Sequence, residues 1–459
     1  MKDINVKRYI PTQINNFLKR RIHIHIKWNK DLSSEIVTLD YEGLVIACDT
    51  ILRVSGTRNT DKNNMCEIQY DLFHKILHNN YRLYLDYLIE NKIVITDGIW
   101  IYKEKSFSYK LNDDFVDNLE SIDINDKLFK KRTIKELLLN TKKLNITTKH
   151  KNNYYKSFKI DFQKAIQYLD YIYINEIPDH KGRVLTKYTR TLLEHKLLQI
   201  NDGQLWMNRS KSNGRINSNL TTLNSDFKQF IYGYSFSLDV VSSQPCLVNL
   251  LFNIINALSG EREDISSSNL SYITSYVCKI LSNNLEPSKF KGFLAHLKIT
   301  KLPNKKEMEI YKNLCESGQL YEFIMNEIYK KTGTKMTRNQ VKEIIMIVFY
   351  SPNTSGSEYK KLFQSIFPSI YSFLCKLKSF KVKRQHRLLP IMLQAIESFI
   401  WVENILPKLD KMSIKYCFIH DSVLVDEIDI ERAYLVIDEQ FTLLKVNPKI
   451  KIENLKIKN

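Results

Sequence analysis

The sequence predicts an α+β protein, and three short segments carry this prediction. Apolar residues flank Asp239 in SLDVVSSQP and Asp421 in FIHDSVLVDE, which is typical of two buried strands that each bring a carboxylate to one end. Between them, TRNQVKEIIMIVFY predicts a helix. One face of that helix carries four residues spaced four apart: Arg338, Lys342, Met346 and Tyr350. Two carboxylates suit a pair of divalent metal ions, and a cationic helix face suits a triphosphate.

Composition indicates a chain of several domains with a nucleic-acid partner. The 459 residues are 43% apolar, which suffices for two to three domains of about 150 residues each. Lys and Arg number 69 against 50 Asp and Glu, so the formal net charge is +19. Such a balance is typical of proteins that bind nucleic acid. The alternative is a compositional bias, because an AT-rich genome by itself enriches Ile, Lys and Asn.

Cysteine usage and hydropathy favour a reducing cytoplasm. The seven cysteines are scattered and never form a CxxC pair, so neither a zinc site nor a disulfide framework is expected. The first residues, MKDINVKRYIPTQ, lack the apolar segment of a signal peptide. No uninterrupted run of about 18 apolar residues occurs, so no membrane span is expected.

The order of predicted elements divides the chain into five parts. Residues 70–111 predict two helices and then two strands around a turn, so residues 1–112 are expected to form an accessory module of winged-helix or similar type. Such a module suits DNA contact, protein contact or a structural cap. Residues 113–204 are expected to form a connection followed by helices, whose basic residues are also typical of a solvated face.

The remaining three parts contain the motifs around the two carboxylates. A basic loop, a strand and an apolar helix are predicted in residues 205–260, helices in 261–387, and a helix, a strand–turn–strand unit, a helix and a last strand in 388–459. A single Asp at a strand end is more often a turn or capping residue, so neither Asp239 nor Asp421 is decisive alone. Their combination favours a shared site, because an acidic group between buried strands must be solvated, paired or metal-bound.

The predicted helix TRNQVKEIIMIVFY resembles the fingers helix of family A DNA polymerases and phage-type single-subunit RNA polymerases. The resemblance implies that Arg338 and Lys342 hold the incoming triphosphate, with Lys342 acting in catalysis. It also implies that Tyr350 lies under the sugar and the template base, and that Met346 completes the nucleotide-binding face.

The two carboxylate segments look like the palm motifs of the same polymerases. SLDVVSSQP is similar to the first palm motif, and IHDSVLVDE is similar to the last. The resemblance implies that Asp239, the Val240 carbonyl and Asp421 bind two Mg²⁺ ions, for which Mn²⁺ can substitute. It also implies that the two aspartates are catalytic and that His420 lies near the primer end.

Two further segments extend the resemblance over residues 210–445. SNGRINSNLTTL resembles a family A segment whose arginine contacts the primer–template duplex, which implies that role for Arg215. LLPIMLQAIESFI resembles the helix before the last motif, whose glutamine reads the minor groove, which implies that role for Gln394. The fold implied is a right-hand polymerase. Its antiparallel palm sheet would lie in residues 205–260 and 388–459, its helical fingers in residues 261–387, and its helical thumb with the connection in residues 113–204.

Departures from the family pattern bear on the product and on proofreading. Ser422 replaces the glutamate of many family A DNA polymerases, and Met346 replaces a common aromatic residue, both as in the RNA polymerases. Ser351 and Pro352 replace the glycine that follows the fingers-helix tyrosine. Roughly 200 residues precede the palm, too few for a proofreading domain together with a thumb, so proofreading is not expected.

The residue five positions after Asp239 bears on the choice of sugar. DNA polymerases of this family usually carry a glutamate there, which bonds the tyrosine and fills the space of a 2′-hydroxyl, whereas the RNA polymerases carry a glycine. Gln244 has the size of a glutamate and can bond the Tyr350 hydroxyl, which favours deoxynucleotides. Two alternatives stay open: Gln244 donates to a 2′-hydroxyl, or it is a turn residue before Pro245.

The sequence therefore predicts a template-directed nucleotidyltransferase that extends a primer 3′-hydroxyl with nucleoside triphosphates. We expect a DNA polymerase of a phage, plasmid or other mobile element. It would act as a monomer on a primer–template duplex in the cytoplasm of its cell or host, with accessory replication proteins and no membrane. A single-subunit RNA polymerase or primase is the alternative of the same class. A non-catalytic DNA-binding replication initiator is the alternative of another class, and the pair of aspartates disfavours it.

Overall fold

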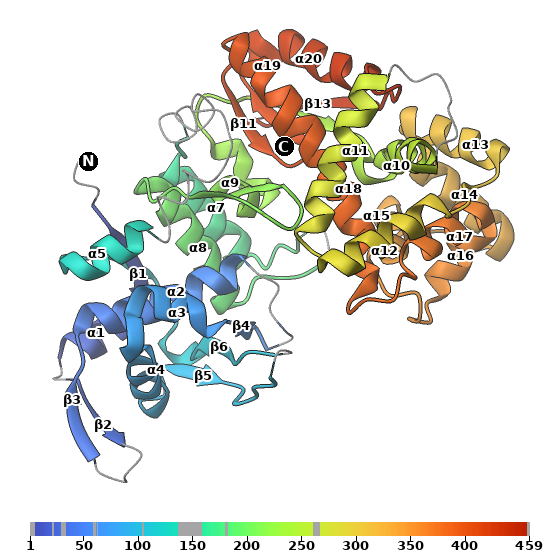
Figure 1. Ribbon diagram of the computed structural model, residues 1–459. Coiled ribbons are helices and arrows are strands. Elements are labelled where there is room, and N and C mark those ends of the chain that lie inside the picture. The colour runs from blue at the N-terminus through green and yellow to red at the C-terminus, as the bar shows by residue number, and fades with distance from the viewer. Residues whose placement is uncertain are drawn as a thin grey trace. The chain divides into compact units, whose positions relative to one another are not determined.

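The chain folds into a mixed α+β structure with small antiparallel sheets, as the computed structural model shows (Figure 1). This confirms the α+β class predicted from the sequence. The described residues are 5–20, 23–28, 34–57, 61, 63–102, 105–135, 158–179, 182–259 and 267–456. Residues 136–157 and 261–266 fall in the predicted connection and the predicted fingers, and they lie outside the described residues.

The chain divides into two compact units. The described residues of the first lie within 5–135, 158–208 and 218–232, and those of the second lie within 209–217 and 233–456. Two short paired strands, β8 (Met207–Arg209) and β9 (Ile216–Ser218), stand where the chain passes from one unit to the other. Residues 205–260 are therefore divided between the two units.

The first unit is built around α2 (Tyr41–Thr57), a helix of mainly small and aliphatic residues whose side chains are largely buried. Because α2 is apolar on nearly every side, it packs against α4, α8, β1 and β6 at once. The other elements of this unit are β1 (Lys7–Pro11), α1 (Thr12–Lys19), β2 (Ile24–Trp28), β3 (Ser34–Thr38), β4 (Cys66–Glu67), α3 (Tyr70–Leu77), α4 (Tyr81–Glu90), β5 (Val94–Thr96), β6 (Ser108–Leu111), β7 (Leu119–Asp123), α5 (Lys127–Thr133), α7 (Phe162–Ile174), α8 (Lys187–Asn201) and α9 (Asn219–Thr222).

The helix-and-hairpin order predicted within residues 70–111 is present. Helices α3 and α4 are followed by strands β5 and β6, which pair antiparallel with Val94 opposite Leu111. Strand β6 also pairs with β4, so the module contains a three-stranded sheet in the order β4-β6-β5. Part of the predicted turn, residues 103–104, lies outside the described residues.

The second unit contains one four-stranded antiparallel sheet in the order β11-β12-β10-β13. Every residue of β11 and β12 is buried, which explains why both strands are continuous apolar runs in the sequence. The bounds of the four strands are β10 (Phe236–Val240), β11 (Tyr416–Ile419), β12 (Ser422–Val425) and β13 (Ile450–Asn454). A strand from the middle of the chain thus lies between strands from its C-terminal part.

Helices make up the rest of the second unit. In Figure 1, α12 to α17 gather on one side of this unit, and α19 and α20 gather with the sheet on the other. The apolar helix α10 packs against α11, α12, α13 and α18. The bounds are α10 (Ser243–Ser259), α11 (Ser267–Ser282), α12 (Pro287–Lys298), α13 (Lys305–Glu316), α14 (Leu320–Thr332), α15 (Arg338–Tyr350), α16 (Glu358–Ile366), α17 (Pro368–Leu377), α18 (Leu388–Ser398), α19 (Leu406–Lys411) and α20 (Ile430–Thr442).

One helical run, Gln385–Lys411, is long and apolar enough to cross a membrane by length and composition. The run joins α18 to α19 through a π-helical stretch, Phe399–Ile405. Within the protein, 72% of its most apolar window is buried, so its apolar residues have neighbours in the fold. This burial is what a core helix of a soluble protein shows, and it is weak support for such a protein.

Candidate active site

The sheet of the second unit brings Asp239 and Asp421 to the same place. Strands β10 and β12 pair with Asp239 opposite Ser422, and Asp421 is the residue before Ser422. The Val240 backbone N–H donates to the Asp421 carbonyl oxygen at 3.4 Å. Opposed residues of antiparallel strands have Cα atoms about 4.5–5.5 Å apart, so the two aspartates come from neighbouring positions at one end of the sheet.

A tight turn presents Asp421 at the tip of the β11–β12 hairpin. Ile419 pairs with Ser422, which leaves a two-residue loop of His420 and Asp421. His420 has φ of +51°, a conformation that is unfavourable for a residue other than glycine. Such backbone strain costs on the order of 1–3 kcal/mol and is found where a turn must aim a side chain. The predicted hairpin with an acidic tip is therefore present.

Burial raises the pKa of the half-buried Asp421 carboxyl above its usual range. The positive charges of Arg215 and Lys342 and a hydrogen bond from Ser243 oppose this rise. Lys342 and Asp421 therefore interact electrostatically although they belong to different elements. A cation bound next to this carboxyl would lower its pKa, because a positive charge favours the ionised form.

The donor set fits Mg²⁺ better than Zn²⁺. Among the described residues, no group of three or more His, Cys, Asp and Glu side chains could hold a metal ion, so a closed structural zinc site is not found there. Mg²⁺ is usually bound by one or two carboxylates and keeps waters or substrate phosphates as its other ligands. Asp239 and Asp421 with the Val240 carbonyl match that pattern.

Helix α15 carries the predicted cationic face. Thr337 caps it, since its hydroxyl accepts from the Gln340 backbone N–H and Gln340 returns the bond. One side of α15 is buried, through Val341, Ile344, Ile345, Val348 and Phe349. The opposite side leaves Lys342 and Met346 exposed and Tyr350 partly covered. The predicted sharing of one face is confirmed.

Arg338 is the first residue of this face, and it forms a weak ion pair with Glu322. Its Nε lies 2.9 Å from the Glu322 carboxylate, and its guanidinium lies over the Tyr321 ring at 4.7 Å. Both side chains of the ion pair are about half exposed. Exposed pairs of this kind contribute about 0–1 kcal/mol, so a phosphate group would displace Glu322 readily.

Two buried lysines hold the end of α15 where the family pattern has a glycine. The Lys378 ammonium donates to the carbonyl oxygens of Val348 and Ser351, and Lys360 donates to that of Pro352. Cations at a helix C-terminus are favourable because the helix dipole is negative there. Burial lowers the pKa of Lys378 to about 8. These contacts keep the position of Tyr350 defined without a glycine.

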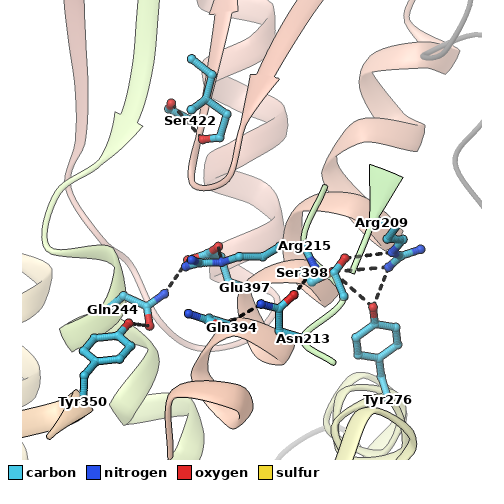
Figure 2. A network of polar contacts seen from close by, with 12 residues as sticks. Arg209, Asn213, Arg215, Gln244, Tyr276, Tyr350, Gln394, Glu397, Ser398 and Ser422 are labelled. Carbon is cyan, nitrogen blue, oxygen red and sulfur yellow. Dashed lines mark hydrogen bonds and ion pairs between the residues drawn. The ribbon is translucent and has the colours of Figure 1, made fainter. Parts of the chain in front are cut away.

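Tyr350 bonds Gln244, as the sequence anticipated. The Tyr350 hydroxyl donates to Gln244 Oε1 at 3.1 Å, which links the end of α15 to the first turn of α10 (Figure 2). Burial raises the pKa of Tyr350 to about 12, so the hydroxyl keeps its proton at neutral pH. Gln244 stands five residues after Asp239, and the pair thus lies beside the carboxylate end of the sheet.

Arg215 makes a contact that the sequence did not predict. Its Nε and Nη2 atoms each lie 2.7 Å from a carboxylate oxygen of Glu397, and Glu397 is only 1% exposed (Figure 2). The Gln244 amide nitrogen donates to the same carboxylate. The duplex contact of Arg215 stays a prediction, and its guanidinium is paired within the chain.

The turn before Arg215 is fitted closely to α18. Gly214 has φ of +76°, and a Cβ there would meet the Tyr276 hydroxyl at 2.5 Å and Ser398 Oγ at 2.7 Å. Ser398 Oγ donates to the Gly214 carbonyl at 2.6 Å. In the same turn, the Asn213 amide donates to Gln394 Oε1 at 2.9 Å. The resemblance-based site residues Arg215 and Gln394 are therefore brought together.

Glu397 and Ser243 are the site residues that the sequence analysis missed. Both lie beside residues that it named, since Glu397 binds Arg215 and Ser243 supports Asp421. A signal for Glu397 existed, because an acidic residue stands inside the apolar helix LLPIMLQAIESFI, three positions after Gln394. Acidic residues are seldom fully buried without a partner.

The buried Glu397 predicts a pH-dependent stability. Burial, with a smaller contribution from Asp421, raises the pKa of Glu397 to about 7 against the pull of Arg215. The folded protein then binds a proton that the unfolded chain releases near pH 4.5, so this group stabilises the fold at low pH and loses that contribution as pH rises to 7. We expect Glu397→Gln to remove a pH dependence on the order of 3 kcal/mol between pH 4.5 and 8. Urea unfolding of both proteins measures it, and equal slopes against pH would contradict the assignment.

Neither the protein-family models nor the curated proteins give a match to this chain.

Proposed function

We propose that this chain is a template-directed nucleic-acid polymerase that transfers nucleotides to a primer 3′-hydroxyl, with DNA as the expected product. One observation carries the proposal. The exposed face of α15, which starts with Arg338 and Lys342, ends at Tyr350, whose hydroxyl bonds Gln244 beside Asp239. If a triphosphate lay along that face, Arg338 and Lys342 would contact its phosphates. Its sugar would then lie near the two carboxylates.

Each group in this arrangement has a chemical task. Asp239 and Asp421 would hold Mg²⁺ together with the Val240 carbonyl. Bound there, Mg²⁺ supplies Lewis-acid activation of the primer hydroxyl and of the leaving pyrophosphate. Lys342 and Arg338 stabilise negative charge on the phosphates, and a fixed cation acts strongly on charge that develops during the reaction. His420 at the hairpin tip would lie near the primer end.

Primer extension tests the proposal directly. A labelled primer on a DNA template, with Mg²⁺ and the purified full chain, should be extended by dNTPs in template order. No extension with dNTPs or NTPs, on a DNA or an RNA template, would refute it and favour a non-catalytic binding protein. Extension by NTPs in preference to dNTPs would favour an RNA polymerase or primase. Ser422 and Met346 are the residue types that the RNA polymerases carry at the matching positions.

Sugar selection should depend on the pair of Gln244 and Tyr350. If Gln244 fills the space of a 2′-hydroxyl, Gln244→Ala should admit NTPs because the obstruction is steric. Tyr350→Phe removes a hydrogen bond worth about 0.5–1.5 kcal/mol, so selection should weaken by a few-fold to about tenfold. The ratio of kcat/KM for a dNTP and its NTP measures both changes. A wild-type preference for NTPs would contradict the steric role of Gln244.

A further inference from the structure

Glu397 lies at the centre of a chain of polar groups that reaches the proposed sugar site. Its carboxylate accepts two hydrogen bonds from Arg215 and one from the Gln244 amide nitrogen. The other end of the Gln244 amide accepts from the Tyr350 hydroxyl. Figure 2 shows these side chains close together, with a dashed line from Gln244 to the Glu397–Arg215 pair and another from Gln244 to Tyr350.

The orientation of the Gln244 amide depends on this carboxylate. The oxygen and nitrogen ends of a glutamine have nearly the same shape, so only their hydrogen-bond partners distinguish them. A tyrosine hydroxyl can donate or accept and therefore fits either end. Above its pKa of about 7 the Glu397 carboxylate is ionised and can only accept, so there it requires that the nitrogen face it and that the oxygen face Tyr350.

Stability alone does not account for an ion pair at this place. Glu397 is 1% exposed, and burial of a carboxylate is unfavourable even when it is paired. An apolar residue of similar volume often replaces a buried ion pair without loss of stability. The residues around it, Leu393, Ala395, Ile396 and Ile400, are buried and apolar, so α18 continues as an apolar core helix on either side. The carboxylate therefore points to a role in orientation.

We propose that Glu397 is a positioning residue that fixes the Gln244 amide, and through it the Tyr350 hydroxyl, and so sets the choice between deoxyribose and ribose. This inference rests on the proposed polymerase function. The oxygen end of Gln244 accepts from Tyr350 and the nitrogen end donates to Glu397, so both ends of the amide are held. A side chain held at both ends stays in the space that a 2′-hydroxyl would enter, which favours exclusion of the ribose.

The test exchanges the two side chains. Glu397→Gln should lower the kcat/KM ratio of dNTP to NTP by a few-fold to about tenfold at pH 8, because either amide orientation then becomes available. The double variant Gln244→Glu with Glu397→Gln restores one carboxylate and one amide across the same gap. It should recover selection to within about threefold of the wild type, which is roughly half a kcal/mol. Gln244→Glu alone places two carboxylates next to each other, which repel, and should not show wild-type sugar selection.

Glu403→Gln is the matched control. Glu403 forms an ion pair with Arg209 six residues further along the same helical run, on a more exposed side chain, and has no contact with Gln244 among the described interactions. The substitution should leave the sugar ratio unchanged. Thermal unfolding of every variant separates loss of fold from loss of selection.

The outcomes separate this inference from the polymerase proposal. A wild type that extends no primer refutes both. A selective wild type whose Glu397→Gln variant keeps the same sugar ratio refutes the positioning role alone, whatever its overall rate. If Glu397→Gln and the exchanged double variant both fail to fold, Glu397 serves the fold and the positioning role is again refuted. Restored selection in the double variant supports it, since a purely structural role would not follow the exchange.

Discussion

Asp239→Ala or Asp421→Ala is expected to abolish primer extension while duplex binding survives. The two carboxylates occupy neighbouring positions at the end of one sheet, and each would supply a metal ligand that the other cannot replace. Metal stabilisation of transition-state charge is worth several kcal/mol, so the rate should fall by roughly 10³-fold or more. Primer extension with dNTPs and Mg²⁺ measures the rate, and a mobility-shift titration with duplex measures the binding.

Glu427→Ala is the control for both aspartates. Glu427 is an exposed acidic residue just beyond β12, so its loss changes the net charge equally without altering the hairpin tip. Its activity should match that of the wild type. Full activity of either aspartate variant would contradict the assignment of the metal site. An equal loss of activity in the control would show that the effect comes from net charge in general.

Lys342→Ala is expected to impair the use of nucleotides far more than the binding of duplex. Lys342 lies on the exposed face of α15, and its charge acts on the Asp421 carboxyl. Removal of one group that stabilises transition-state charge costs about 10²–10³ in kcat. Duplex affinity should change by less than about threefold, because one of many phosphate contacts is a small part of the electrostatic total. Single-turnover extension over a range of dNTP concentrations separates the two quantities.

Lys361→Ala provides the comparison for Lys342. Lys361 is a highly exposed lysine on α16 that pairs with the exposed Glu358. Its substitution removes the same charge from a neighbouring helix and should leave nucleotide use unchanged. A matching loss in both variants would indicate a general effect of positive charge, and an unaffected Lys342→Ala would remove α15 from the proposed triphosphate site.

Local pattern was enough to predict several elements of the second unit. The one-face spacing of Arg338 to Tyr350 is a property of residues four apart, so the sequence displays it directly. The β11–β12 hairpin was predicted for the same reason, since two apolar runs flank a two-residue turn. The α+β class followed from the order of such elements.

Tertiary structure alone decided which polar groups meet. Arg215 and Glu397 are 182 residues apart in the chain, and Gln244 and Glu397 are 153 apart. An arginine in a turn and an acid in an apolar helix each have many compatible partners, and no local period relates them. The sequence by itself therefore determined the elements, the exposed face of α15 and the two carboxylate positions. Only folding, which packs α18 against α10 and α15 and must pair each buried charge, placed Glu397 between Arg215 and Gln244.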